Sequence, residues 1–140
     1  MMITMLKIPS YASIDGQKRK EIIGGMCEYV VYSGEIRVLS IKRTERSKLQ
    51  TRMYGGPDYE GYEITYRFIA NEKIEESFAE DWIKEEQVFR FFNSWFPSEE
   101  YIIMHKIETG KSYPAEIMVI EKGTCTPILI EVEGWERNIY

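Results

Sequence analysis

Charged side chains that alternate with apolar ones are the feature of this sequence most able to do chemistry. Carboxylates can hold a divalent metal ion, and Arg and Lys can clamp the oxygens of a phosphate. The basic candidates for phosphate contacts on the predicted strands are Arg37, Arg43, Arg52 and Arg67. The acidic candidates for metal ligation are Glu63, Glu131 and Glu133, and the expected metal is Mg²⁺ or Mn²⁺.

The charges are unevenly spread along the chain. The net charge is −5, made of +3 in residues 1–70 and −8 in residues 71–140. Residues 42–52 alone carry +4, which suits either a phosphate-binding patch or a solvated strand or loop. The overall acidity argues against nucleic acid as a partner. The acidic second half instead suits a small regulator or inhibitor that binds a basic surface of another protein.

Other familiar chemistries find little support. His105 is the single histidine, so a histidine-based metal cluster or a Ser-His-Asp triad is not expected. Cys27 and Cys125 lie far apart without CxxC spacing, and we predict two reduced core thiols in a cytoplasmic protein. The sequence has no signal-peptide pattern and no apolar run long enough to span a membrane, so a membrane partner is not expected.

The length of 140 residues and the 44 % of apolar residues predict one α+β domain over residues 1–140, with a mostly antiparallel sheet. Two-residue alternation is clearest from Tyr62 to Phe68. Ser33 and Gly34 predict the turn of a hairpin. The seven or eight predicted strands cover residues 3–8, 27–32, 35–43, 49–54, 61–69, 101–107, 114–121 and 126–134.

Two helices are predicted beside the sheet. A short one covers residues 15–23, and one long helix near residues 72–96 begins after Asn71 and ends at Pro97. Its predicted buried stripe is Ile74, Phe78, Trp82, Phe89, Phe92 and Phe96. The pattern leaves two arrangements open. A flat sheet would put the strand charges in water, whereas an eight-stranded tunnel or barrel, closed or partly closed, could turn them inward.

The order of these elements over about residues 1–134 resembles the CYTH, or triphosphate tunnel metalloenzyme, family. The strand from Tyr62 to Arg67 resembles the family strand whose last basic residue contacts phosphate. Glu131 and Glu133 resemble the family's closing Glu-x-Glu pair, which implies metal ligation. Arg37 and Lys106 stand where the family has basic residues, so the resemblance adds Lys106, and Lys7 of the opening strand, to the expected phosphate contacts.

The sequence also departs from the family pattern. The family opens with Glu-x-Glu-x-Lys, but the matching stretch from Ile3 to Lys7 keeps only the lysine. Leu39 and Glu108 stand where further basic residues are expected. The resemblance therefore predicts a basic-lined tunnel that binds a nucleotide or another polyphosphate with little or no catalysis. A metal-dependent triphosphatase or nucleotidyl cyclase is a further alternative, beside the acidic interaction protein.

Overall fold

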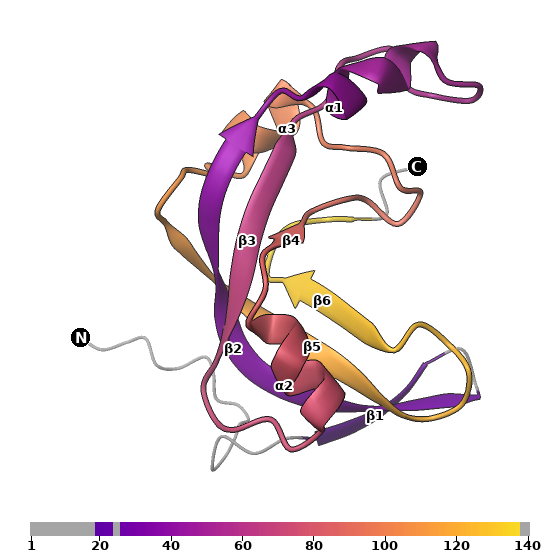
Figure 1. Ribbon diagram of the computed structural model, residues 1–140, viewed down its shortest axis with the longest axis vertical. Coiled ribbons are helices and arrows are strands. Elements are labelled where there is room, and N and C mark those ends of the chain that lie inside the picture. The colour runs from indigo at the N-terminus through magenta and orange to yellow at the C-terminus, as the bar shows by residue number, and fades with distance from the viewer. Residues whose placement is uncertain (1–18, 24–25, 138–140) are drawn as a thin grey trace.

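The chain forms a curled antiparallel sheet with short helices around it (Figure 1). In this computed structural model the described residues are 19–23 and 26–137. The strands are β1 (Arg19–Ile23), β2 (Cys27–Lys42), β3 (Glu63–Ala70), β4 (Gln87–Val88), β5 (Ser112–Lys122) and β6 (Ile128–Val132). The helices are α1 (Glu45–Leu49), the 3-10 turn η2 (Gln50–Arg52), α2 (Ser77–Ile83) and α3 (Glu99–Met104).

The sheet has the order β4-β3-β2-β5-β6, and β1 pairs with the beginning of β2. It curls into a half-barrel, so the predicted α+β class with an antiparallel sheet is confirmed. The described strands do not close into an eight-stranded tunnel. The predicted strands at 61–69, 114–121 and 126–134 correspond to β3, β5 and β6.

The long strand β2 replaces the predicted hairpin at Ser33 and Gly34. It runs unbroken for 16 residues, and Gly34 lies between Ala70 of β3 and Ala115 of β5. A Cβ atom at Gly34 would lie 2.7 Å from Cζ of Phe68 and would also collide with the carbonyl of Ile69. The glycine therefore permits a close approach of strands rather than a turn.

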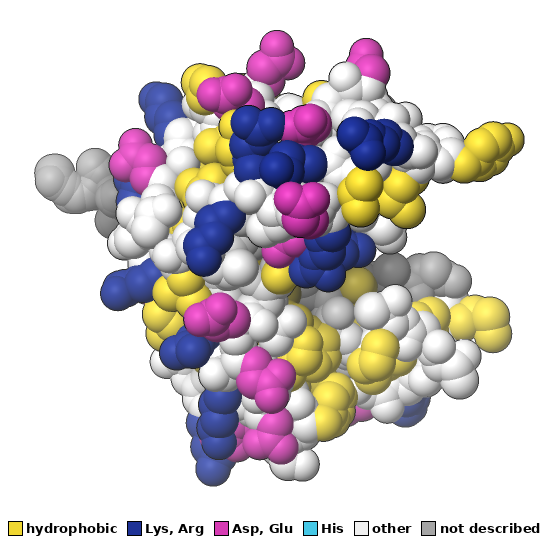
Figure 2. Space-filling model, turned by 45° about the horizontal axis from the view of Figure 1, so that its top comes forward, with side chains coloured by type: hydrophobic (Ala, Val, Ile, Leu, Met, Phe, Trp, Pro, Cys, Tyr) yellow, Lys and Arg dark blue, Asp and Glu magenta, His cyan; other side chains and the backbone are white. Residues whose placement is uncertain are grey.

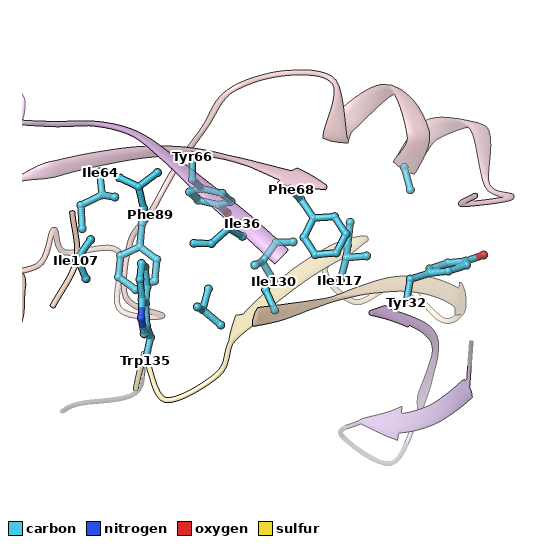
Figure 3. Packing of buried hydrophobic residues seen from close by; sticks show 14 of the residues in the cluster. Tyr32, Ile36, Ile64, Tyr66, Phe68, Phe89, Ile107, Ile117, Ile130 and Trp135 are labelled. Atoms are coloured by element: carbon cyan, nitrogen blue, oxygen red, sulfur yellow. The ribbon is translucent and has the colours of Figure 1, made fainter. Parts of the chain in front are cut away.

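The apolar core fills the concave side of the half-barrel. Ile36, Ile64, Phe68 and Ile117 are fully buried there. Figure 3 shows Ile36, Phe68 and Ile117 close to Ile130 of β6, with Ile64 farther along the core near Phe89. Because side chains alternate along a strand, Arg37 of β2, Arg67 of β3 and Glu131 of β6 lie on the outer, convex face. Glu63, Thr65 and Arg67 share that face, as their two-residue spacing predicts.

The predicted long helix at 72–96 is wrong. Only α2 is helical in that range, and the chain then pairs with β3 through β4. The backbone N–H of Phe89 donates to the carbonyl of Ile64 at 2.9 Å, which extends this pairing. Phe89 is buried as predicted, but Phe78 is 46 % exposed and Phe92 is 56 % exposed. The aromatic run pairs with β3 instead, because this arrangement satisfies its backbone groups and also buries Phe89 and Phe91 in the core.

Three other predicted elements also differ. Residues 101–107, predicted as a strand, contain α3, because the Ser98 hydroxyl accepts the N–H of Tyr101 and starts a helix. Residues 49–54, predicted as a strand, contain the end of α1 and η2. Residues 19–23 of the predicted first helix pair with β2 as β1. The predicted strand at 3–8 and residues 15–18 lie outside the described residues.

Arg137 joins the two edges of the half-barrel. Its Nη1 donates to the carbonyl of Ile130 on β6 at 2.8 Å, and its Nε donates to the carbonyl of Arg90, just past β4, at 2.9 Å. The guanidinium lies 4.8 Å from the ring of Phe89 and 5.0 Å from that of Phe92. Burial lowers the pKa of Arg137. This single side chain satisfies carbonyls of both edges and so holds the curl in place.

Cys27 and Cys125 form a disulfide, so the prediction of two reduced thiols is wrong. Their Cα atoms are 6.3 Å apart although 98 positions separate them in sequence. The pairing of Glu28 with Lys122 brings the turn after β5 beside the beginning of β2. In that turn Gly123 has a φ of +107°, and a Cβ atom there would meet Sγ of Cys27.

No helix among residues 19–23 and 26–137 is both long enough and apolar enough to span a membrane.

Candidate functional site

An arm projects from one end of the half-barrel (Figure 1). An open groove lies beside this arm. The arm is residues 43–62, which include α1, η2 and the loop after them. The groove has a volume of about 960 Å³, and its second wall is the segment 93–100. Its lining residues are Arg43, Gly55, Pro57, Asp58, Tyr59, Glu60, Tyr62, Asn93, Trp95, Ser98, Glu99 and Glu100.

Gln50 ties the two walls of the groove together. Its side chain is 1 % exposed, and its Oε1 accepts the backbone N–H of Phe96 at 2.8 Å. Its Nε2 donates to the carbonyls of Tyr59 and Phe96, each at 3.3 Å. A buried amide with this many partners is costly to disrupt, so the groove walls are held in one arrangement.

Further contacts reinforce this tie. The hydroxyl of Tyr59 donates to the carbonyl of Phe96 at 3.1 Å, and the N–H of Tyr62 donates to the carbonyl of Pro97 at 2.9 Å. Between them, Gly61 passes so close that an added Cβ atom would lie 2.5 Å from Cβ of Phe96. The groove is therefore preformed by backbone contacts between its walls.

The arm is anchored to β3 by an ion pair. Thr44 and Ser47 form a capping box that begins α1. Glu63 then accepts from Nε of Arg46 and from the hydroxyl of Thr44, both at 2.6 Å. The hydrogen bond from Arg46, supported by that from Thr44, lowers the pKa of Glu63 against the opposing effect of burial. Glu63 is thus committed to holding the arm.

The groove carries an excess of negative charge. Asp58, Glu60, Glu99 and Glu100 line it together with one guanidinium, that of Arg43, which leaves a formal charge of −3. Arg43 itself pairs with Glu60 and lies 6.0 Å from the ring of Tyr62. Figure 2 shows acidic and basic side chains intermixed over this end of the molecule. The combination of carboxylates and aromatic rings suits a cationic ligand.

Arg37 and Arg67 are the two predicted phosphate contacts that the structure brings together. They are direct partners on β2 and β3, and both are exposed on the outer face. Nε of Arg37 also donates to the hydroxyl of Ser112 on β5 at 3.3 Å. Two like charges placed opposite one another repel. An anion bound between Arg37 and Arg67 would relieve this repulsion and could accept hydrogen bonds from both guanidinium groups.

The other predicted cations lie elsewhere. Arg43 lines the groove, Arg52 is exposed at the end of η2, and Lys106 is exposed just after α3 with a φ of 55°. Lys7 lies outside the described residues. The contacts of the described residues do not join these side chains to the Arg37 and Arg67 pair.

The three predicted metal ligands do not meet. Glu131 on β6 and Glu133 just after it are exposed at one edge of the sheet, whereas Glu63 is on β3 and bound to Arg46. Within the part of the chain that the structure describes, no group of three or more His, Cys, Asp or Glu side chains is placed to hold a metal ion. These carboxylates therefore do not fit the metal centre that the resemblance implies.

The sequence predicts a site role for only one of the residues that line the groove, Arg43, and that role is phosphate binding. Gln50 had been placed on a strand, and Trp95 inside the long helix. The sequence carries a local signal at this wall, because Asn93 and Ser94 are residue types that favour turns. In the structure Ser94 has a φ of 78°. The loop from Gly55 to Asp58 also carries strong turn residues. The two walls of the groove meet through contacts between segments far apart in sequence, such as Gln50 and Phe96, which are 46 positions apart.

The fold and groove together define an α+β protein with an antiparallel half-barrel and a preformed acidic, aromatic cleft. Comparison with protein-family models, curated proteins and solved structures found no match.

Proposed function

We propose that this chain is a protein-interaction module whose groove binds a Lys- or Arg-containing segment of another protein. The observation that carries the proposal is the formal charge of −3 in a groove that also exposes aromatic rings. Carboxylates attract such a segment and orient it, and the faces of Tyr62 and Trp95 can accept an Arg or Lys side chain. A polyphosphate would meet net repulsion in the same groove.

The internal contact of Arg43 supports this chemistry. Its guanidinium sits near the Tyr62 ring while it pairs with Glu60, which is the arrangement expected for a bound Arg of a partner. Three further carboxylates, those of Asp58, Glu99 and Glu100, line the groove for additional cations. Because Gln50 preforms the walls, binding requires little ordering of the groove itself.

Changing Glu99 and Glu100 together to Gln is expected to weaken binding of a labelled hexa-arginine peptide about tenfold, or about 1.4 kcal/mol. Gln keeps the shape of each side chain and removes its charge, so the attraction falls while α3 persists. The measurement is fluorescence anisotropy at about 0.1 M ionic strength, where charges more than about 10 Å apart are largely screened.

The matched control changes Glu131 and Glu133 to Gln, which removes the same charge from the outer face of β6. Its affinity for the peptide should stay within about twofold of wild type, because separated exposed charges are largely screened. An equal loss in both variants would mean that the peptide senses only net charge, and the groove would not be its site.

A second candidate function is binding of a nucleotide or other polyphosphate, as the CYTH resemblance predicts. The observation that favours it is the opposed, exposed pair Arg37 and Arg67, with the hydroxyl of Ser112 beside Arg37. In this proposal the anion would bind on the outer face rather than in a tunnel. Mg²⁺ or Mn²⁺ could accompany the phosphates as counter-ions.

Millimolar nucleoside triphosphate is expected to raise the melting temperature of wild type by a few degrees, because a ligand that binds only the folded state stabilises it. Changing Arg37 and Arg67 together to Gln should abolish the shift, whereas changing Arg52 to Gln should preserve it. Thermal unfolding with and without Mg²⁺ or Mn²⁺ provides the measurement. A shift that survives in the double variant would refute binding at this pair.

A further inference from the structure

The end of the arm is an apolar and basic projection, which we call the tip (residues 48–54). Leu49 is 44 % exposed, Met53 is 55 % exposed and Tyr54 is fully exposed. Lys48 and Arg52 lie among them, and the sequence has no carboxylate between positions 48 and 54. Figure 2 shows apolar side chains with Lys and Arg side chains beside them at the outer end of the arm.

The tip and the groove are complementary in charge and in chemistry. The tip carries two cations and three exposed apolar side chains, whereas the groove carries a formal charge of −3 and aromatic rings. The groove volume of about 960 Å³ is large enough for several side chains. The tip of a single copy points away from the half-barrel at the end of its arm (Figure 1).

We infer that the tip of one copy seats in the groove of a second copy, and that the exchange is reciprocal in a two-fold dimer. This inference rests on the proposed function, because it names the chain's own tip as a basic segment that the groove accepts. Lys48 and Arg52 would face Glu99 and Glu100 of the other copy. Met53 and Tyr54 would cover the exposed faces of its aromatic residues.

Reciprocity follows from where the two surfaces lie. Gly55 and Pro57, which line the groove, follow the tip directly in sequence. The two complementary surfaces are therefore adjacent on each copy, as a self-complementary two-fold interface requires. A closed pair then covers both tips at once and leaves no complementary surface free to extend the assembly.

The test is a charge swap followed by sedimentation velocity on the full chain over a range of concentrations. Wild type should sediment as a concentration-dependent dimer. The tip variant K48E/R52E and the groove variant E99K/E100K should each dissociate at least tenfold more readily, because like charges then meet in their own homodimers. An equimolar mixture of the two variants should re-form the dimer, since both tip-to-groove contacts regain opposite charges.

The control variant E131K/E133K changes the same number of charges on β6 and should dimerise like wild type. Circular dichroism and thermal unfolding establish that each variant is folded. Wild type that stays monomeric at every concentration, or variants that fail to associate when mixed, would overturn the inference. If the monomer nevertheless binds hexa-arginine through Glu99 and Glu100, the proposed function stands and only the self-association is refuted. If peptide binding also fails, both are refuted.

Discussion

Changing Cys125 to Ser is expected to lower the free energy of unfolding by about 3 to 5 kcal/mol. The disulfide joins positions 98 apart, so opening it restores to the unfolded chain the freedom of a very long loop. Cys27 is buried beside Tyr29, Val31 and Met118 and would remain there as a free thiol. Denaturant unfolding near 25 °C, with and without a reductant, measures the effect.

The reductant supplies the control for this prediction. It should destabilise wild type to about the level of the Cys125→Ser variant and should leave the variant unchanged. Alkylation of two thiols in native, unreduced wild type, together with no response to the reductant, would contradict the disulfide. The loss should not depend on the groove, because the bond lies between the beginning of β2 and the turn after β5.

Changing Gln50 to Leu is expected to cost about 2 to 4 kcal/mol of stability. Leu matches the size of Gln but leaves the backbone N–H of Phe96 and the carbonyl of Tyr59 without the amide that now satisfies them. Both groups lie beside the buried amide, so water cannot fully replace the hydrogen bonds that they would lose. The measurement is the free energy of unfolding in urea.

The same variant should also weaken hexa-arginine binding by more than tenfold, because the loop at 55–60 would lose its tie to the segment at 93–100. Gln87 offers a matched control, since its Nε2 donates a single hydrogen bond to the carbonyl of Trp82 at 3.1 Å. Gln87→Leu should cost about 0.5 to 1.5 kcal/mol and leave peptide affinity unchanged. A Gln50→Leu protein with wild-type affinity would show that the groove does not depend on this amide.

Local patterns in the sequence were sufficient to predict three strands. In β3, Ile64, Tyr66 and Phe68 point into the core while Arg67 points out, as strict alternation requires. β6 follows for the same reason, whereas β5 carries a continuous apolar run from Ile117 to Ile120, because both of its faces are covered there. Alternation is a property of neighbouring residues, so it can be recognised before any partner strand is known.

Residue spacing failed as a guide where one sequence pattern fits both a helix and a strand. Phe89, Phe92 and Phe96 fit helical spacing, but Phe89 and Phe91 also fit a strand, and both are buried beside β3. Tyr101, Ile102 and Ile103 look like a buried strand, yet the Ser98 cap starts a helix. The choice depended on whether backbone partners were present nearby, which only the folded sheet supplies.

The sequence by itself determined the α+β class, the alternating strands and the acidic excess of the second half. Tertiary structure alone decided that the core fills the concave face, that Arg37 and Arg67 meet on the outer face, and that Cys27 reaches Cys125. It also assembled the groove, whose walls depend on contacts between Gln50 and Phe96. The physical reason is that β2 curls and pairs on both sides, so segments far apart in sequence become neighbours through register and curvature.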